Sequence, residues 1–186
     1  MHLSQLIKYY FIDDFNPIHL KDLDKNVNLI WRNKNTKENL NKIYQLTEFC
    51  RRNKLKLFFA NDVRLAMKLG LNGAYISAHN KAFRFNSYNF KKGFKIIGSA
   101  HNIFEVNIKK KQKISEIFIS PMFKYKHKNP LGIHKIKFFP KDKKIKKIAL
   151  GGVSEKNIGL LKLVKFDGFA GINIFKKKGP KNLGPF

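Results

Sequence analysis

Short apolar runs alternate with polar or amphipathic stretches along nearly the whole chain. The runs are rich in Ile, Leu, Val, Phe and Tyr, a composition typical of strands that are buried on both faces of a sheet. Eight of them predict strands, at residues 9–13, 28–34, 55–61, 73–77, 94–99, 116–120, 146–150 and 166–174.

Helical spacing appears between most of these runs. After Thr36, apolar residues recur at helical spacing from Leu40 to Phe49, and Asp62 opens a short helix that Gly70 closes. A further helix is expected from about residue 103, and another from about residue 155, with Ser154 as its N-cap. Residues 81–92 are polar and aromatic, which indicates a very short helix or none.

Strands that alternate with helices predict an α/β fold with a parallel sheet, and eight strands are the number that closes a TIM (β/α)8 barrel. We expect one barrel domain over residues 1–186, with an open doubly wound sheet as the alternative. The sequence Lys176–Pro180 is unsuited to a regular helix, so the last helix is reduced or missing. A second subunit, as in a homo-oligomer, or residues 1–8 would then cover the last strand.

A glycine pair follows the seventh predicted strand. Gly151 and Gly152 let backbone N–H groups approach an anion without hindrance from a Cβ atom, and the predicted helix after Ser154 would add its positive end. The eighth strand also ends in a glycine turn, at Gly171 and Ile172. Together the two turns predict a phosphate site, although Gly151 and Gly152 could instead form only a tight turn between strand and helix.

Other polar residues follow the predicted strands at the end where barrel enzymes hold their active sites. Cations facing the glycine turns favour a highly phosphorylated substrate, and Asp62 could hold Mg²⁺ beside it. Taken singly, each residue has a simpler explanation, as a solvated charge, a helix cap or an exposed loop residue. The candidates are Arg32, Lys34, Asn61, Asp62, Ser99, His101, Ser120, Lys124, Lys126, His127 and Lys128.

The formal net charge of +27 suggests nucleic-acid binding. The lysines are nevertheless scattered, and the densest runs, Lys109–Lys111 and Lys141–Lys147, fall where outer surface is expected. We therefore expect no specific nucleic-acid partner, only weak and salt-sensitive binding to polyanions. No segment is long and apolar enough for a membrane span, no signal peptide is evident, and one cysteine, Cys50, permits no internal disulfide. These features predict a cytoplasmic protein.

The order of the motifs resembles the thiamine phosphate synthase/TenI family. The similar segments cover nearly the whole chain, and their order and spacing matter more than any single motif. They include residues 10–13, 31–34, 60–62, 65–76, 98–101, 120–123, 130–132, 149–153 and 167–172.

The resemblance implies a transferase that joins a hydroxymethylpyrimidine diphosphate to a thiazole phosphate and releases pyrophosphate. It further implies a role for each matching residue, with Lys128, Ser99 and His101 as the catalytic candidates. Arg32, Lys34, Asn61, Ser99 and Lys128 would hold the pyrimidine diphosphate. Asp62 and Asn80 would lie at the Mg²⁺ site, and Gly151, Gly152, Gly171 and Ile172 would bind the thiazole phosphate.

Several positions depart from the synthase pattern. Ile30 stands in place of a Gln, Tyr75 in place of a His, and Asn80 in place of a second Asp, while Tyr125 and His127 replace two Thr residues. The resemblance therefore leaves a TenI-like thiazole tautomerase open, which needs no metal and uses a histidine as acid and base. A non-catalytic phosphate-binding paralogue is a further alternative.

Overall fold

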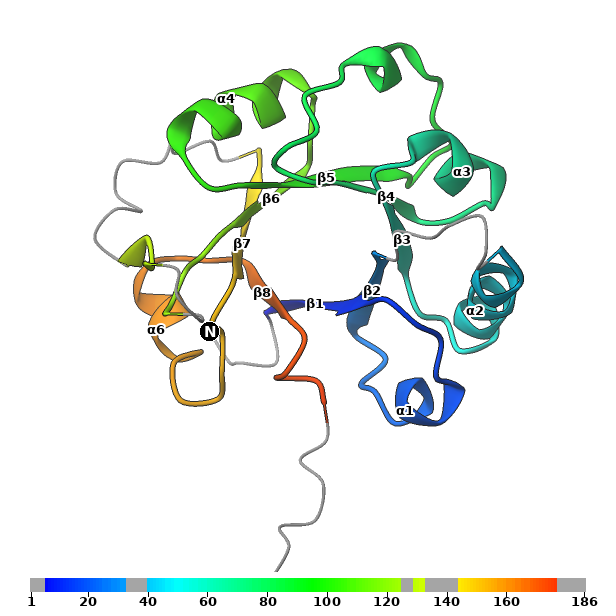
Figure 1. The fold of residues 1–186 in the computed structure, drawn as a ribbon, viewed down its shortest axis with the longest axis horizontal. Helices are drawn as coiled ribbons and strands as arrows, with labels where there is room; N and C mark the ends of the chain where they lie inside the picture. Colours follow the sequence, from blue (N-terminus) through cyan, green and yellow to red (C-terminus); the bar gives the residue numbers. More distant parts are fainter. Residues whose placement is uncertain (1–5, 33–39, 125–128, 133–143, 177–186) are drawn as a thin grey trace, which may run out of the picture.

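The computed structural model describes residues 6–32, 40–124, 129–132 and 144–176. Eight parallel strands close into a barrel in chain order, as Figure 1 shows in a view down the barrel. This confirms the predicted TIM-barrel architecture and excludes the open doubly wound sheet. The strands are β1 (Ile7–Ile12), β2 (Val27–Trp31), β3 (Leu57–Ala60), β4 (Gly73–Ile76), β5 (Lys95–Ala100), β6 (Glu116–Ile119), β7 (Lys146–Leu150) and β8 (Gly168–Gly171).

The closure between the first and last strands answers what covers the edge of β8. Ile7 pairs with Gly168 and Tyr10 with Gly171, so the edge lies against β1. A Cβ atom at position 168 would come within 2.3 Å of the Ile7 carbonyl oxygen, so this approach requires glycine. The expectation that residues 1–8 contribute is confirmed for Ile7 and Lys8, and no second subunit is needed to complete the sheet.

Large apolar side chains fill the inside of the barrel. Their rings meet edge to face, with the Tyr9 and Phe118 centroids 4.9 Å apart and those of Phe11 and Tyr75 5.2 Å apart. The inside of the barrel is thus a packed core and not a pore. This inner cluster consists of Tyr9, Phe11, Ile30, Phe58, Tyr75, Ile97, Phe118, Ile148 and Ala170.

The helices lie outside the barrel (Figure 1). They are α1 (Pro17–Lys21), α2 (Leu40–Arg52), α3 (Val63–Lys68), α4 (Ile103–Lys111) and the short α6 (Leu160–Leu163), with a 3₁₀ turn η2 (Arg84–Ser87). Asp62 caps α3 by accepting the Leu65 N–H at 2.9 Å, and Asn102 caps α4 in the same way through Glu105. The predicted helix starts at these two sites are therefore confirmed, and η2 agrees with the very short helix expected within 81–92.

The helix predicted from residue 155 is wrong in its start. Residues 155–159 form turns, and α6 begins only at Leu160. The side chain of Asn157 accepts the Ser154 N–H and donates to the Gly152 carbonyl, and so ties these turns to the glycine pair. Because α6 has four residues and begins far from the glycine pair, its dipole contributes little there.

No regular helix follows β8 as far as residue 176, and most of the segment on which a reduced last helix is predicted, Lys176–Pro180, lies outside the described residues. A turn over residues 172–175 lies there instead, closed by the Phe175 N–H donating to the Ile172 carbonyl. The Phe175 ring stacks on Phe169 of β8 with centroids 5.8 Å apart and also contacts Tyr10 of β1. Phe175 thereby covers part of the outer surface of β1 and β8.

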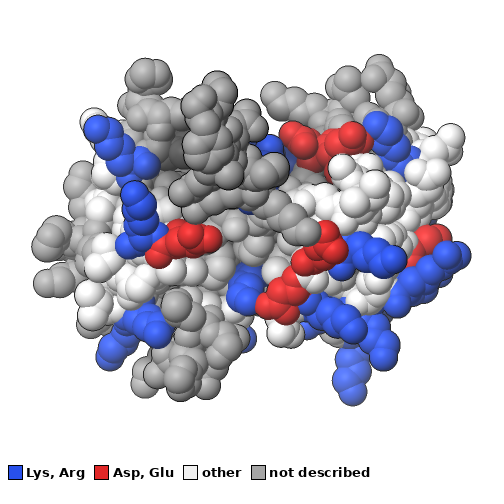
Figure 2. Space-filling view, turned by 90° about the horizontal axis from the view of Figure 1, so that it is seen from below, with Lys and Arg blue, Asp and Glu red and all other residues white. Residues whose placement is uncertain are grey.

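Charge is dispersed over the side of the barrel that Figure 2 shows. Lysine and arginine side chains lie there among acidic and uncharged ones and form no continuous basic stripe. Some cations have acidic partners, such as Lys42 with Asp14 at 2.8 Å and Lys8 with Asp24 at 2.6 Å. Among the described helices, none is long and apolar enough to cross a membrane.

Candidate functional site

A cavity of about 520 Å³ lies at the carboxyl ends of the strands. Residues at or just after the ends of seven strands line it, so one site gathers polar groups that are distant in sequence. The lining residues named as candidates from the sequence are Arg32, Asn61, Ser99, His101, Ser120, Gly151, Gly152, Gly171 and Ile172.

Arg32 supplies the positive charge of this cavity. Its backbone N–H donates to the Ile12 carbonyl at 2.8 Å, which continues the strand pairing one residue beyond β2. Side chains alternate along a strand, so Arg32 shares the inward direction of Ile30. Its guanidinium carbon lies 5.4 Å from the centre of the Phe11 ring, a cation–π contact that holds the charge over the barrel mouth.

Tyr75 and Ser99 form the polar part of the cavity floor. Burial raises the pKa of the Tyr75 hydroxyl to about 12, although a hydrogen bond with Ser99 and the nearby charge of Arg32 both act to lower it. The phenol therefore stays protonated at neutral pH. Ser99 is itself buried, so the pair offers hydrogen-bonding groups at the base of the cavity.

The glycine pair forms the opposite wall. Gly151 and Gly152 have φ angles of +86° and +70°, the left-handed region that glycine adopts without strain. A Cβ atom at Gly152 would come within 2.7 Å of the Lys124 carbonyl oxygen. Both residues are therefore required as glycine by their conformation and by the loop that follows β6.

Backbone donors are available at this wall. Neither the Gly152 N–H nor the Val153 N–H donates to an acceptor within the described residues, and both residues line the cavity. Free N–H groups beside a glycine turn are suited to binding an anion. The phosphate site predicted here stays a prediction, now supported by the turn and not by a helix dipole.

The second predicted turn has a different geometry. Gly171 and Ile172 line the cavity, but Gly171 does not have a left-handed φ. A Cβ atom there would lie 3.1 Å from the Ile174 side chain, so packing is what favours glycine at this position. Asn173 brings a further polar side chain to the same wall.

Two histidines face each other across the loops after β4 and β5. The rings of His79 and His101 stack with centroids 6.0 Å apart, and His101 Nδ1 lies 3.1 Å from Glu105 Oε2. Glu105 Oε2 also accepts the backbone N–H of His101, which fixes the start of α4. Sequence analysis missed His79, although it lies two residues after the predicted strand 73–77, just as His101 lies two residues after the predicted strand 94–99.

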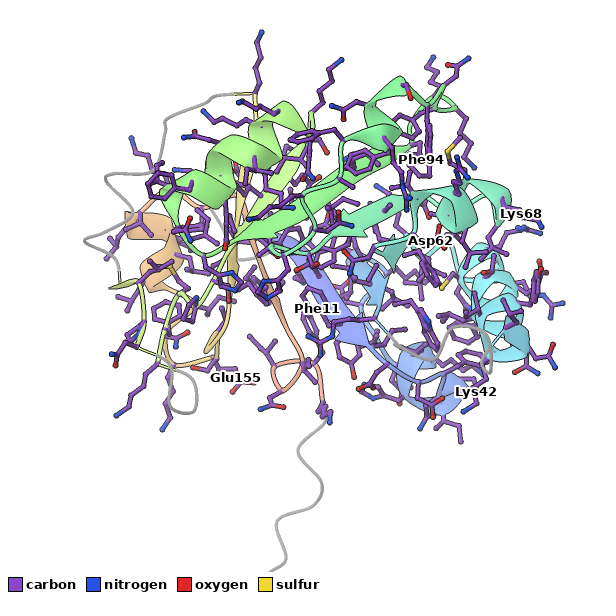
Figure 3. The ribbon with its side chains drawn as sticks, turned by 45° about the horizontal axis from the view of Figure 1, so that its top comes forward. Phe11, Lys42, Asp62, Lys68, Phe94 and Glu155 are labelled. Carbon is purple, nitrogen blue, oxygen red and sulfur yellow. The ribbon has the colours of Figure 1, made fainter. Side chains whose placement is uncertain are left out.

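The candidate metal ligands lie at the rim. Asp62 caps α3, at the position labelled in Figure 3, and neither Asp62 nor Asn80 lines the cavity. Asn61 adopts φ of +63° and its Oδ1 accepts the Ser77 N–H, while Asn80 Oδ1 accepts the Ala82 N–H. Within the described residues, no three histidine, cysteine or acidic side chains form a metal-binding group.

Two of the predicted cations, Lys34 and Lys128, lie outside the described residues, as do Lys126 and His127. Their assignment stays a prediction. The prediction that Lys109–Lys111 lie on the outer surface is wrong for Lys109, which is 0% exposed. Its position on the buried face of α4, three residues after Val106, is the sequence signal that was overlooked.

Comparison with known proteins agrees with this geometry. The family described as thiamine monophosphate synthase matches residues 22–175. A thiamine-phosphate synthase from Prochlorococcus marinus (strain AS9601) is 32% identical over 130 residues, which are 67% of this chain and 36% of that protein. The match therefore spans about a third of the relative's length.

Solved structures show the same fold. A thiamine phosphate pyrophosphorylase from Pyrococcus furiosus superposes with a TM-score of 0.70 over 92% of this chain and 88% of its own, at 17% identity. The enzyme of that name from Bacteroides thetaiotaomicron reaches 0.59 over 96% and 88%, at 18% identity. A copper homeostasis protein, CutC from Streptococcus agalactiae, also scores 0.69 at 11% identity over 91% and 99%, so the fold alone does not define the activity. Because the family match covers most of its length, the chain belongs to the thiamine monophosphate synthase/TenI family.

Proposed function

We propose that this protein is a thiamine phosphate synthase-like transferase that couples hydroxymethylpyrimidine diphosphate to thiazole phosphate. The observation that carries the proposal is one cavity with a guanidinium, Arg32, and backbone N–H groups at Gly152 and Val153 that have no acceptor among the described residues. A reaction between two phosphorylated molecules needs two anion sites in one space. The cavity volume of about 520 Å³ is in the range of small-molecule sites.

The chemistry is a substitution at the pyrimidine methylene carbon. Its bond to the diphosphate oxygen breaks, the electron pair leaves with pyrophosphate, and the thiazole nitrogen forms the new C–N bond. Arg32 would stabilise the negative charge that develops on the leaving oxygen, with Lys34 and Lys128 as further expected cations. Phe11 and Tyr75 would exclude water from the carbon that becomes positive.

Mg²⁺ would accompany the diphosphate in this proposal. Asp62 uses Oδ1 as a helix cap, and within the described residues its other carboxylate oxygen accepts no hydrogen bond, so it fits as one ligand. Mg²⁺ is commonly held by one or two carboxylates together with substrate phosphates. When bound, the ion would supply positive charge to the leaving group, while Asn80 could add a neutral oxygen ligand only if its side chain left Ala82.

The departures from the family pattern change the pyrimidine site. Ile30 is fully buried inside the barrel and offers no hydrogen bond where the pattern has a Gln. The hydroxyls of Tyr75 and Ser99 offer hydrogen-bonding groups on the cavity floor in its place. We therefore propose that they orient the pyrimidine ring.

The direct test is incubation of the protein with both heterocyclic substrates and Mg²⁺, with detection of thiamine phosphate. We expect product, and Arg32→Ala should lower its rate of formation at least about tenfold, since one charge-assisted interaction is lost. Arg51→Ala is the matched control, because Arg51 lies on the surface of α2 and pairs with Glu48. Absence of product with the unmodified protein would reject the transferase.

A second candidate, a TenI-like thiazole tautomerase, is favoured by the histidine pair. Glu105 holds His101 through its ring and backbone nitrogens, and His79 faces the same ring. A carboxylate that accepts Nδ1–H leaves Nε2 to accept a proton, the arrangement of a general base. Such a base would remove a proton from one position of the thiazole derivative and return it at another, with no net redox change.

A further inference from the structure

The buried lysine of α4 has no part in the reactions above. Lys109 lies between α4 and β5, and a Cβ atom at Gly98 would come within 3.1 Å of its Cδ atom. Glycine at this position therefore leaves room for the lysine side chain. Burying a charged group is costly unless it finds partners, so its contacts should explain its presence.

Those partners match the ammonium group in number. Lys109 Nζ donates to the Ser77 carbonyl at 2.7 Å, the Asn80 carbonyl at 2.8 Å and Gln112 Oε1 at 2.9 Å. A protonated lysine has three donors, and all three are used here. Burial lowers the pKa of Lys109 to about 8 against a smaller opposite effect of Glu105, so the group is charged at neutral pH.

Gln112 extends the same network. It is 1% exposed, and its Nε2 donates to the Asn80 carbonyl at 3.0 Å and to the Ala82 carbonyl at 2.8 Å. The two side chains of this α4 clamp, Lys109 and Gln112, thus make four hydrogen bonds to backbone carbonyls of residues 77–82. Those residues form the β4 loop, which has no regular secondary structure.

The β4 loop carries residues of the cavity wall. Ser77, Ala78 and His79 line the cavity, and His79 stacks on His101. A buried apolar residue at position 109 could fill the same space without the cost of desolvation, but it could not hold two carbonyls of the loop. The specific consequence of lysine here is a fixed loop path.

We propose that the α4 clamp is a positioning device that holds the β4 loop and so sets His79 opposite His101 at the cavity mouth. It deepens the proposed function, because its catalytic consequence rests on the cavity being the active site. Its effect on the loop is independent of any activity. Neither residue of the clamp lines the cavity, so each acts through the loop.

Amide hydrogen exchange tests the clamp directly. In Lys109→Met we expect exchange of the amides of residues 78–82 to accelerate at least about tenfold, while amides of β7 and β8 keep their rates. Lys111→Met is the matched control, with the same change on the exposed face of the same helix. Equal loop exchange in the two variants would overturn the proposal.

The NMR signals of the histidine rings give a second measurement, which a general loss of stability would not change. NMR spectra should show altered ring chemical shifts of His79 in Lys109→Met and unchanged shifts in Lys111→Met. Gln112→Glu tests the clamp if Lys109→Met does not fold, because it keeps an oxygen for Lys109 and removes both Nε2 donations. Faster exchange at residues 80–82 is expected, and unchanged exchange there would reject the proposal.

These readouts separate the clamp from the reaction. If the unmodified protein forms no thiamine phosphate but the exchange result holds, the proposed function fails and the clamp stands. If the transferase is active, Lys109→Met should change kcat or KM by at least about threefold more than Lys111→Met. Equal kinetics combined with faster loop exchange would show a clamp with no role in positioning the site and would overturn that part of the proposal.

Discussion

Tyr75 shows how one residue can be shaped by opposing influences. Its ring packs edge to face with Phe11 and Phe118 inside the barrel, while its hydroxyl meets Ser99 near the charge of Arg32. Burial is the largest influence and raises its pKa to about 12. The position that departs from the family pattern thus supplies a neutral hydrogen-bonding group over the whole physiological pH range.

This raised pKa predicts an alkaline effect on stability. An acid whose pKa is higher in the folded than in the unfolded state binds more protons when folded, so stability falls as pH rises from about 10 to about 12. Tyr75→Phe removes this contribution. The free energy of unfolding, measured by urea denaturation between pH 8 and 11, should therefore fall less steeply in the variant, and parallel curves would contradict the assignment.

The roles of Asp62 and His101 differ between the two enzymatic branches. For the transferase, we expect Asp62→Ala and Lys128→Ala each to lower coupling at least about tenfold, roughly 1.4 kcal/mol of transition-state stabilisation, and His101→Ala to do less. Coupling rates and thermal unfolding of each variant check this, since Asp62 also caps α3. Thiazole isomerisation that resists EDTA and Asp62→Ala but is lost in His101→Ala would establish the tautomerase instead.

At the scale of elements, the turn after β7, at Gly151 and Gly152, is constrained by its left-handed backbone and by close contacts. Gly152→Ala places a Cβ atom against the Lys124 carbonyl in a left-handed conformation, so we expect a loss of about 1–3 kcal/mol in stability and of phosphate binding. Gly93→Ala is the control, since its φ is +88° and nothing lies within 4 Å. Urea denaturation and phosphate titration measure both, and equal losses in the two variants would contradict the close approach.

The elements also show what the sequence could predict. All eight strands, the helix that opens at Asp62 and the helix from about residue 103 were predictable, because apolar runs and helical spacing are local signals. The start of α6 was not, because residues 155–159 form turns, and the bond from Asn157 Nδ2 to the Gly152 carbonyl is a contact that residue type alone does not reveal. The burial of Lys109 was missed because its acceptors are backbone carbonyls about thirty residues away in the chain.

The candidate site was predicted unevenly for a similar reason. Residues directly after strands, such as Arg32, Ser99 and Gly151, reach the cavity because parallel strands end together. Asp62 follows β3 just as closely but turns to cap α3, so position in the chain did not decide where its carboxylate lies. The pairing of His79 with His101 depends on the path of the β4 loop, which carries no periodic pattern.

At the scale of the whole molecule, charge and fold are separate questions. A net charge of +27 on 186 residues produces attraction to any polyanion, whereas specific recognition needs cations gathered on one surface. The side shown in Figure 2 has cations interspersed with acidic residues. Ion pairs such as Lys42 with Asp14 reduce the positive electrostatic potential around these cations. On the side shown, the described cations therefore offer no gathered surface for specific recognition of a nucleic acid.

We therefore expect duplex DNA to bind weakly and without sequence preference. The affinity should fall steeply when the salt concentration is raised from 50 mM to 150 mM, because released counterions supply most of the binding free energy. At 150 mM salt we expect a dissociation constant above about 1 μM. Fluorescence anisotropy with two unrelated duplexes across this salt range measures both quantities. Phosphate at millimolar concentration should compete only through ionic strength, as sodium chloride of equal strength would. Tight, sequence-dependent binding at 150 mM salt would require a nucleic-acid surface on a face of the barrel other than the cavity. It would contradict the interpretation that the positive charge is dispersed.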